Sequence, residues 1–438
     1  MINMLEFEKE LERRTPKSKV LFERAKKVVP GGVHANLRYM PPYPFHVARA
    51  EGTNLYDVDG NVYDDYWIGH GACFLGHGNP AIREAVKRQL EDDWLFGLTH
   101  EKHIELAERI VKMVPHAEKV RFANTGTEAN LFAIRLVRAF TGRDYIGKFE
   151  GGWHGGYDPL NVAVHAPWDR PNSAGLTEES LKHTITLPFN YVDEVRERIK
   201  GMEKKMACII VEPFLGAGGF IPPEEGFLQG LREITQEHGI ILIFDEVISG
   251  FRLAPGGAAE YYGVEPDMSI FGKALSGGFP IGAIAGRADI MDLMSPLSTV
   301  EPNKRVAHGG TFCANPLSMV AGIASMEQLE DGKYQKMAGE IGAKVRENLR
   351  NILGGRAQVI GAHCATAVHF TDRPPKNAVE ATTPRNMEKS KLTKMAFLTK
   401  NIYFVEGMRG YTIPVHSNAQ LDKLFEVTKG FVKKGLFD

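Results

Sequence analysis

The feature that most constrains the fold is an alternation of short apolar runs and helical patterns between residues 118 and 286. Apolar residues recur with helical spacing in residues 128–140 and 228–238, whereas the runs between such stretches are too short for helices. These runs read KVRFAN, YIGKF, ACIIVEP, IILIFDEV and MSIFGKA. Parallel strands need crossover connections, usually helices, which cover the faces of the sheet. We therefore expect an α/β fold with a mostly parallel central sheet and helices on both faces.

A chain of 438 residues is longer than one hydrophobic core usually serves, so we expect more than one domain. Residues 1–65 hold an arm and most of the hairpin pattern NLYDVDGNVYDDY, and we assign them to a small domain. Residues 66–316 are predicted to form the large α/β domain. The pattern then changes to helices, a strand pair near residues 358–370 and a final helix, which predicts a small α+β domain over residues 317–438. Residues 372–390, polar and containing three prolines, are predicted to be a mobile loop.

Composition points to small-molecule partners. The chain has 53 Lys and Arg against 54 Asp and Glu, which gives no electrostatic reason to expect a nucleic acid or an anionic membrane as partner. No apolar run reaches the roughly 18 residues of a membrane helix, and the start MINMLEFEKELERR does not resemble a signal peptide. The cysteines lie far apart without the spacing of a disulfide framework or a zinc site, so we expect a cytoplasmic protein with reduced thiols and no metal. They are Cys73, Cys208, Cys313 and Cys364.

Ligands of open α/β sheets bind beyond the carboxyl ends of the strands, so the residues that follow each apolar run are candidates for function. KVRFAN is followed by Thr125, Gly126, Thr127 and Glu128, which open a helical pattern. Free backbone N–H groups at the positive end of a helix dipole suit a phosphate. An ordinary helix cap explains the same residues, because Ser and Thr are favoured at that position without any ligand.

Three further strand ends carry residues that suit a pyridoxal 5′-phosphate (PLP) cofactor. Asp245 ends a buried run, where a carboxylate needs a partner such as a protonated pyridine nitrogen. Lys273 follows the next run in a glycine-rich setting, where desolvation makes an amine a nucleophile toward an aldehyde. Trp153 and His154 follow YIGKFEGG, which places an aromatic ring where it can lie flat on the cofactor. A turn cap, a surface lysine and a core tryptophan are the structural alternatives; the occurrence of all these residues along one sheet favours the cofactor.

The chain resembles class III PLP-dependent aminotransferases of fold type I, and within them the glutamate-1-semialdehyde 2,1-aminomutase subgroup. The resemblance runs from about Ser18 to the C-terminus and rests on several dense motifs. They are PGGV at 30–33, FANTGTEAN at 122–130, GRDYIGKFEGGWHG at 142–155, VEPFLGAGGFIPP at 211–223, IFDEVISGFR at 243–252, GKALSGGFPIGA at 272–283 and GGTFCANPL at 309–317.

The resemblance implies roles for the cofactor residues. Lys273 would carry PLP as a Schiff base and shuttle a proton, and Asp245 would pair with the pyridine nitrogen. Val247 would pack on one face of the ring and Trp153, where the subgroup usually has Tyr, would stack on the other. Catalysis is thus expected to depend on Lys273 and Asp245.

The resemblance also implies a homodimer with shared active sites. Gly126 and Thr127 would bind the phosphate, and Thr311 would reach the phosphate of the neighbouring subunit. Glu212 and His154 would lie near the cofactor, with roles that the sequence leaves open.

The substrate side departs from the aminomutase pattern. Arg38 matches the arginine that grips the substrate carboxylate, a task for which a planar guanidinium is suited. Ala217 stands where the aminomutases usually have Asn, and His70 where many have Trp. Arg409 could offer a second carboxylate site, as in β-amino acid aminotransferases, or be a surface arginine.

These departures favour an aminotransferase that moves an amino group between a donor amino acid, possibly a β-amino acid, and a keto acid or aldehyde. The alternative is the aminomutase, which isomerises glutamate-1-semialdehyde to 5-aminolevulinate without net exchange of amines. A third hypothesis is a protein that binds PLP without catalysis.

Overall fold

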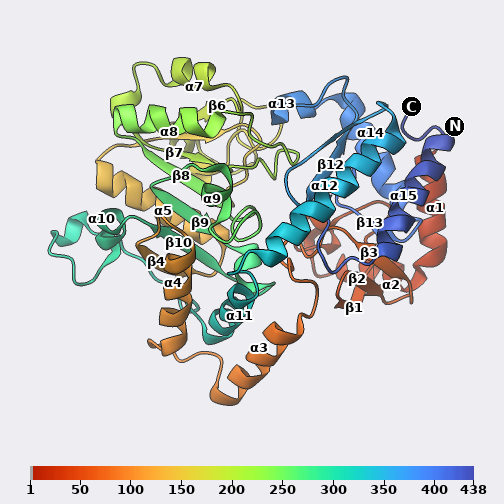
Figure 1. The fold of residues 1–438 in the computed structure, drawn as a ribbon, viewed down its shortest axis with the longest axis horizontal. Coiled ribbons are helices and arrows are strands. Elements are labelled where there is room, and N and C mark those ends of the chain that lie inside the picture. The colour runs from red at the N-terminus through yellow and green to blue at the C-terminus, as the bar shows by residue number, and fades with distance from the viewer. Residues whose placement is uncertain (1–2) are drawn as a thin grey trace.

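The computed structural model describes residues 3–438, and its centre is a seven-stranded mixed sheet (Figure 1). The strand order is β4-β10-β9-β8-β7-β5-β6, and only β10 runs antiparallel to its neighbours. Every residue of β7 to β10 is buried, which explains why their sequences are continuous apolar runs. The strands are β4 Lys119–Ala123, β5 Tyr145–Phe149, β6 Thr184–Leu187, β7 Met206–Val211, β8 Ile241–Glu246, β9 Met268–Phe271 and β10 Gly282–Gly286.

Helices cover both faces of this sheet, as the sequence predicts. Successive residues of β8 point to opposite faces of the sheet. Leu242 packs with α7 and α8, whereas Ile243 packs with α5. The helices that precede, follow or cross the sheet are α3 Pro80–Asp92, α4 Glu101–Met113, α5 Gly126–Thr141, α6 Glu178–Leu181, α7 Val192–Ile199, α8 Phe227–His238, α9 Gly257–Tyr262, α10 Ala288–Met291 and α11 Pro316–Glu327.

The two ends of the chain meet on the other side of the molecule (Figure 1). The predicted hairpin is present as β2 and β3, and β13, from the far end of the chain, extends its sheet by pairing in parallel with β3. A second small sheet has the order β11-β12-β14. The strands are β1 Val47–Glu51, β2 Asn54–Asp57, β3 Val62–Asp65, β11 Gln358–Ile360, β12 Ala365–His369, β13 Ile402–Tyr403 and β14 Gly410–Tyr411. The domain limits at residues 65 and 316 stay predictions.

The helices of this part are α1 Met4–Arg14, α2 Pro16–Ala25, α12 Lys333–Leu353, α13 Ala378–Ala381, α14 Pro384–Leu398 and α15 Asn418–Lys433. The expectation of a loop over residues 372–390 is wrong, because α13 and the start of α14 lie there. Pro384 occupies the first turn of α14, where its missing N–H is harmless, and Thr383 caps that helix. The prolines of this segment therefore mark a helix start as well as a break.

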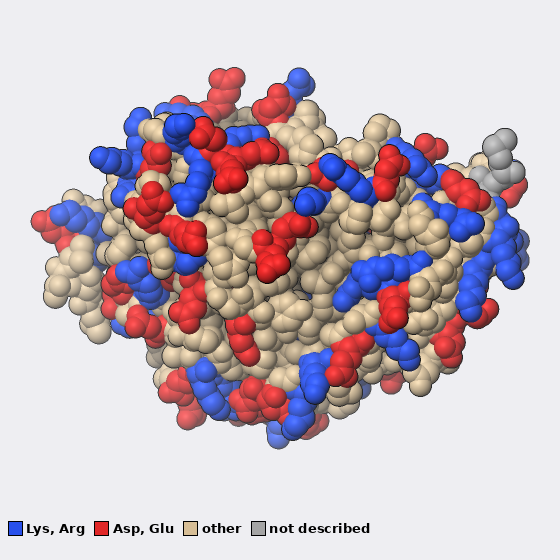
Figure 2. All heavy atoms as spheres, turned by 45° about the horizontal axis from the view of Figure 1, so that its top comes forward, with Lys and Arg blue, Asp and Glu red and all other residues tan. Residues whose placement is uncertain are grey.

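Three features of the described residues bear on partners. Among residues 3–438, every helix falls short of the length and apolarity that a membrane crossing needs. Within the same residues, no three His, Cys, Asp or Glu side chains are grouped so that they could hold a metal ion. Figure 2 shows acidic and basic side chains interspersed over one face, in line with the formal charge of −1.

The contact between α12 and the turn that precedes β12 requires a glycine. A Cβ at Gly342 would overlap the backbone of His363 and Cys364, which cannot move aside as a flexible side chain can. We expect Gly342→Ala to lower the free energy of unfolding by about 1–3 kcal/mol through overpacking. Gly430 in α15 is the matched control, because nothing lies within 4 Å of a Cβ there. Gly430→Ala should be neutral or stabilise by about 0.5–1 kcal/mol. Thermal denaturation followed by circular dichroism checks both; equal shifts of the same sign would contradict the assigned contact.

Candidate active site

The candidate residues lie at the carboxyl ends of neighbouring strands. Asp245 belongs to the end of β8 and pairs with Ile270 of the parallel β9, and Lys273 follows β9. Glu212 follows β7, the other neighbour of β8, and Trp153 follows β5. The chain thus brings an amine, two carboxylates and an aromatic ring to one edge of the sheet, where open α/β folds bind ligands.

Asp245 is a buried carboxylate held by three fixed donors. One oxygen, Oδ2, accepts hydrogen bonds from Nδ2 of Asn130 at 2.9 Å and from Nδ1 of His154 at 2.8 Å. The other, Oδ1, accepts from the backbone N–H of Val247 at 3.0 Å. A carboxylate only accepts, so Nδ1 of His154 carries the proton. Burial lowers the pKa of His154, which makes this imidazole a neutral donor.

The charge of Asp245 is therefore held in place without a cation in direct contact among residues 3–438. Such a buried anion is stabilised most by a positive partner, and a protonated pyridine nitrogen is one. The donor set around Asp245 fits the ring nitrogen of PLP.

Lys273 opens the 3-10 turn Lys273–Ser276 with a left-handed backbone, φ +44°. Burial lowers the pKa of its ammonium, and the carboxylates of Asp245 and Glu212 oppose this shift. The result is an amine that loses its proton more readily than a surface lysine, as a nucleophile toward an aldehyde must.

Glu212 ties two loops together, a role that the sequence left open. Its Oε1 accepts from the backbone N–H of Trp153 at 2.9 Å, and its Oε2 accepts from Gly216 at 3.1 Å and Ala217 at 3.3 Å. Burial, with the nearby Asp245, raises the pKa of Glu212. The turn that carries Trp153 and the loop that carries Ala217 thus share one acceptor.

Trp153 stands at the rim of the site. Its side chain is 48% exposed, which excludes the alternative that it is a core residue. The ring is thus free to cover a bound ligand.

A cradle of small residues lies at the start of α5. Thr125 caps this helix by accepting from the N–H of Glu128, and Gly126 and Thr127 form its first turn. The Thr127 hydroxyl accepts from the N–H of Gly156 at 3.2 Å. A Cβ at Gly126 would lie 3.0 Å from Val247, so this side chain packs against the glycine. Backbone N–H groups in the first turn of a helix have no acceptor within it, and the arrangement fits a phosphate.

The four predicted substrate residues lie in two cavities. Arg38 and His70 line the first, of about 570 Å³, together with Trp67. Burial lowers the pKa of His70, and the charges of Arg38 and Lys273 lower it further. The charge of Lys273 thus acts on the His70 imidazole, although Lys273 does not itself line this cavity.

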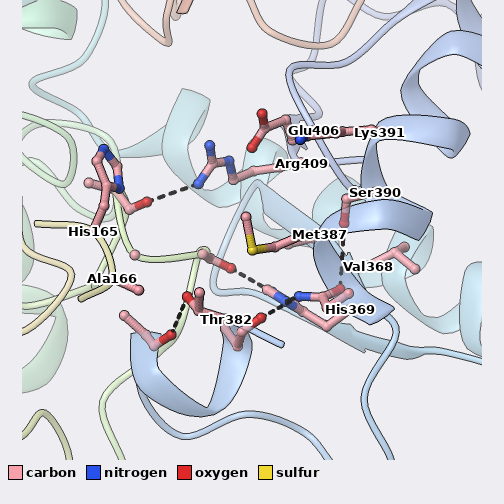
Figure 3. A pocket seen from close by; sticks show the side chains of 18 of the residues that line it. His165, Ala166, Val368, His369, Thr382, Met387, Ser390, Lys391, Glu406 and Arg409 are labelled. Atoms are coloured by element: carbon pink, nitrogen blue, oxygen red, sulfur yellow. Dashed lines mark hydrogen bonds between the residues drawn. The ribbon is translucent and has the colours of Figure 1, made fainter. Parts of the chain in front are cut away.

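Ala217 and Arg409 line the second cavity, of about 300 Å³, in front of α14. Arg409 and Glu406 point into it from the segment before β14 (Figure 3). Arg409 donates from Nη1 to the carbonyl oxygen of Ala217 at 2.9 Å, and its guanidinium lies 5.9 Å from the ring centre of Trp67. Arg409 is therefore not a surface arginine, and its neighbour Trp67 lines the first cavity.

Thr311 is exposed on the surface of the chain. Its predicted contact with the phosphate of a neighbouring subunit stays a prediction, because the structure describes one chain.

Three residues escaped the sequence analysis. Asn130, a partner of Asp245, lies one helical turn after Gly126, a spacing that would have placed both on one face of α5. Lys148 is fully buried and donates from Nζ to the carbonyl oxygens of Gly152 at 3.0 Å and Val162 at 2.5 Å. Burial lowers the pKa of Lys148 to about 7. A lysine inside the apolar run YIGKF was the available signal. Trp67 had none.

Comparison with curated proteins finds close relatives over most of the chain. The glutamate-1-semialdehyde 2,1-aminomutase of Methanocaldococcus jannaschii is 48% identical over 366 residues, which cover 82% of this chain and 84% of that protein. The enzyme of the same name from Methanothermobacter thermautotrophicus is 45% identical over 369 residues, with 83% and 86% covered.

Solved structures of similar chains have the same fold. An ω-transaminase from Sphaerobacter thermophilus is 34% identical with a TM-score of 0.90, covering 95% of this chain and 97% of that one. A β-phenylalanine aminotransferase from Variovorax paradoxus is 30% identical with a TM-score of 0.88, covering 98% and 97%. Residues 36–385 match the family model of class-III aminotransferases. The chain therefore belongs to the class-III aminotransferases, PLP-dependent enzymes of fold type I, as its motifs predict.

Proposed function

We propose that this enzyme is a glutamate-1-semialdehyde 2,1-aminomutase, which moves an amino group between two carbons of one substrate to give 5-aminolevulinate. Relatives of that name at 48% and 45% identity support this choice. They favour it over the intermolecular aminotransferase that the substrate-side departures suggested first. Ala217 and His70 are compatible with this reaction, because one or two changed wall residues tune a pocket more easily than they change a reaction.

The observation that carries the proposal is the different state of the two arginines. Arg38 lies in the cavity that His70 also lines, and within residues 3–438 its guanidinium forms no ion pair with an acidic side chain. Arg409 instead donates to the carbonyl oxygen of Ala217 and lies against Trp67 and Phe220. One free guanidinium suits a substrate with one carboxylate. Glutamate-1-semialdehyde and 5-aminolevulinate each have one carboxylate.

Different residues of the site would hold different parts of PLP. When bound, the ring of this cofactor acts as an electron sink. Lys273 would bond the cofactor aldehyde and move the proton at the substrate carbon, and Asp245 would keep the ring nitrogen protonated, oriented by His154 and Asn130. Val247 and Trp153 would cover the two ring faces. Gly126 and Thr127 would hold the phosphate at the start of α5. Glu212 would fix the position of Trp153 through its backbone N–H.

The proposal includes a homodimer with shared sites, formed in the cytoplasm. Several large apolar side chains are exposed, which is typical of surfaces that another protein covers. They include Leu98, Leu297 and Phe312, with exposed fractions of 83%, 88% and 57%, and Phe312 is next to Thr311. A second copy that covers these side chains would bring Thr311 to the neighbouring phosphate.

An intermolecular aminotransferase is the second candidate, and Arg409 favours it. A keto acid acceptor with two carboxylates could bind one of them at Arg38. The other could draw the guanidinium of Arg409 away from the carbonyl oxygen of Ala217. The solved relatives at 34% and 30% identity are transaminases by name.

Incubation of the pure holoenzyme with glutamate-1-semialdehyde alone separates the two candidates. We expect 5-aminolevulinate to form in many turnovers per active site without added amine or keto acid, because the amino group never leaves the enzyme. Colorimetric detection of the product checks this. Product limited to one equivalent per site, with turnover only when an amino donor and a keto acid are both supplied, would establish the aminotransferase instead.

Substitution of the two arginines tests the assignment of the carboxylate site. Arg38→Gln removes a charge-assisted hydrogen bond worth about 1.5–3 kcal/mol, so kcat/KM should fall roughly 10- to 150-fold. Arg409→Gln should change kcat/KM for glutamate-1-semialdehyde by less than about threefold, because its guanidinium is engaged by the backbone. A larger loss for Arg409→Gln than for Arg38→Gln would overturn the assignment. Steady-state kinetics of both variants gives the comparison.

The pH dependence of cofactor uptake tests the setting of Lys273. The free amine reacts with the aldehyde, so the rate at which apoenzyme takes up PLP should rise with pH around a midpoint below that of an ordinary lysine. The Glu212 carboxylate raises the pKa of Lys273, so Glu212→Gln should move the midpoint to lower pH. Glu150→Gln is the control, since Glu150 is buried near Lys148 and is not among the charges that shift Lys273. Stopped-flow absorbance gives the rates. A midpoint raised by Glu212→Gln, or moved equally by both variants, would contradict the arrangement.

A further inference from the structure

One peptide bond at the rim of the site is held at both ends. The carbonyl oxygen of Gly152 accepts from Nζ of Lys148 at 3.0 Å, and the N–H of Trp153 donates to Oε1 of Glu212 at 2.9 Å. This carbonyl and this N–H belong to the same planar peptide unit, in which they point in opposite directions. Rotation of the plane would therefore break both hydrogen bonds. We call the two side chains, Lys148 and Glu212, the peptide clamp.

Both members of the peptide clamp are themselves anchored. Lys148 lies in β5, which pairs in parallel with β7, and Glu212 follows β7. Both side chains are buried. Nζ of Lys148 also donates to the carbonyl oxygen of Val162 at 2.5 Å, and Oε2 of Glu212 accepts from two backbone N–H groups in the loop that carries Ala217. The Gly152–Trp153 peptide is thus fixed relative to the central sheet.

The backbone that leads to Trp153 has little stiffness of its own. Gly151 and Gly152 precede this residue, and glycine has the greatest conformational freedom of all residues. Gly151 has a left-handed backbone, φ +82°. The Trp153 side chain is about half exposed, so packing restrains the indole only in part. The position of the ring therefore depends on the peptide that carries it.

The hold of Lys148 on this peptide does not require a charge. Lysine is almost never fully buried unless it has partners, and burial lowers the pKa of Lys148 to about 7. The carboxylates of Glu212 and Glu150 oppose this shift. A neutral amine keeps two N–H groups, one for each of the two carbonyl oxygens that Lys148 binds. The peptide clamp can therefore hold in either protonation state of the amine.

We propose that Lys148 is a positioning residue for the amino-group reaction: with Glu212 it holds the Gly152–Trp153 peptide and so sets where the indole meets a bound cofactor. The inference rests on the proposed role of Trp153 as the cover of the cofactor ring. Lys148 acts through Trp153, because the next residue, His154, is fixed by its own hydrogen bond to Asp245. An aromatic face that is already in place adds to binding, whereas one that must first be ordered costs entropy.

A double-mutant cycle on the affinity of the full-length apoenzyme for PLP tests this coupling. Trp153→Ala removes the ring and should raise the Kd about 3- to 10-fold. Lys148→Met keeps an apolar side chain of similar length but removes the amine, and it should raise the Kd about threefold or more. In the Trp153→Ala background, Lys148→Met should change the Kd by less than about twofold, because no ring is left to position. Titration followed by the absorbance of bound cofactor gives the four constants.

Lys394 offers the matched control. Burial lowers the pKa of this lysine as well, but the charges that act on it belong to Glu406 and Arg409, which line the second cavity. Lys394→Met should therefore leave the Kd for PLP within about twofold of the wild type. Loss of a buried amine affects stability in both variants, whereas only Lys148→Met should affect the cofactor.

Hydrogen exchange in the wild-type apoenzyme gives a second test, which needs no variant to fold. The N–H of Trp153 donates to a buried carboxylate although its side chain lies at the rim. This amide should exchange about tenfold more slowly than in an unstructured peptide, or slower still. Mass spectrometry with fragmentation to single residues measures the rate.

Several results would overturn the inference. They are an unchanged Kd in Lys148→Met, an equal loss in Lys394→Met, an undiminished effect of Lys148→Met in the Trp153→Ala background, and exchange of the Trp153 N–H at the rate of a free peptide. If Trp153→Ala leaves the Kd unchanged, the proposed cover of the ring is wrong and the inference falls with it. If Lys148→Met does not fold, the exchange rate decides. Cofactor binding is measured throughout, so a failure of the proposed aminomutase reaction leaves these results intact.

Discussion

The buried carboxylate of Asp245 is the constraint on which the rest of the site depends. A charge at the end of a fully buried strand is tolerated only if donors surround it, and each of its donors comes from a different segment. Asn130 links it to α5, His154 to the turn after β5, and Val247 to the loop after β8. The cradle for a phosphate, the aromatic rim and the strand that precedes Lys273 are thereby held at fixed positions around one anion. The remaining demand of that anion is a cation, and the protonated ring nitrogen of PLP would fit it.

A second set of buried polar groups supports the first. Lys148 ties the turn that carries Trp153 to the segment near Val162, and Glu212 ties the same turn to the loop that carries Ala217. The two side chains also interact with each other, because the charge of Glu212 raises the pKa of Lys148 against the effect of burial. The rim is therefore positioned by hydrogen bonds of buried polar side chains, while Trp153 itself is 48% exposed.

Sequence patterns predict the sheet and the residues at its strand ends, because both follow from local chemistry. Continuous apolar runs locate β7 to β9, and a polar residue after such a run is forced to the edge where Asp245 and Lys273 lie. Contacts between distant segments could not be read in the same way. The bond of Arg409 to Ala217 and the contact of its guanidinium with Trp67 depend on how the two ends of the chain pack on the large sheet. The identities of Ala217 and His70 favour the aminotransferase, whereas the comparisons favour the aminomutase.

The pairing of β3 with β13 joins residues near 65 to residues near 402. The hairpin of β2 and β3 emerges early during synthesis, but its sheet stays open at one edge until residues 402 and 403 have left the ribosome. The large sheet, built from residues 119–286, has no such dependence. The order of assembly therefore runs from the middle outward, and a product truncated after residue 400 would keep all strands of the central sheet while leaving β3 with an unpaired edge.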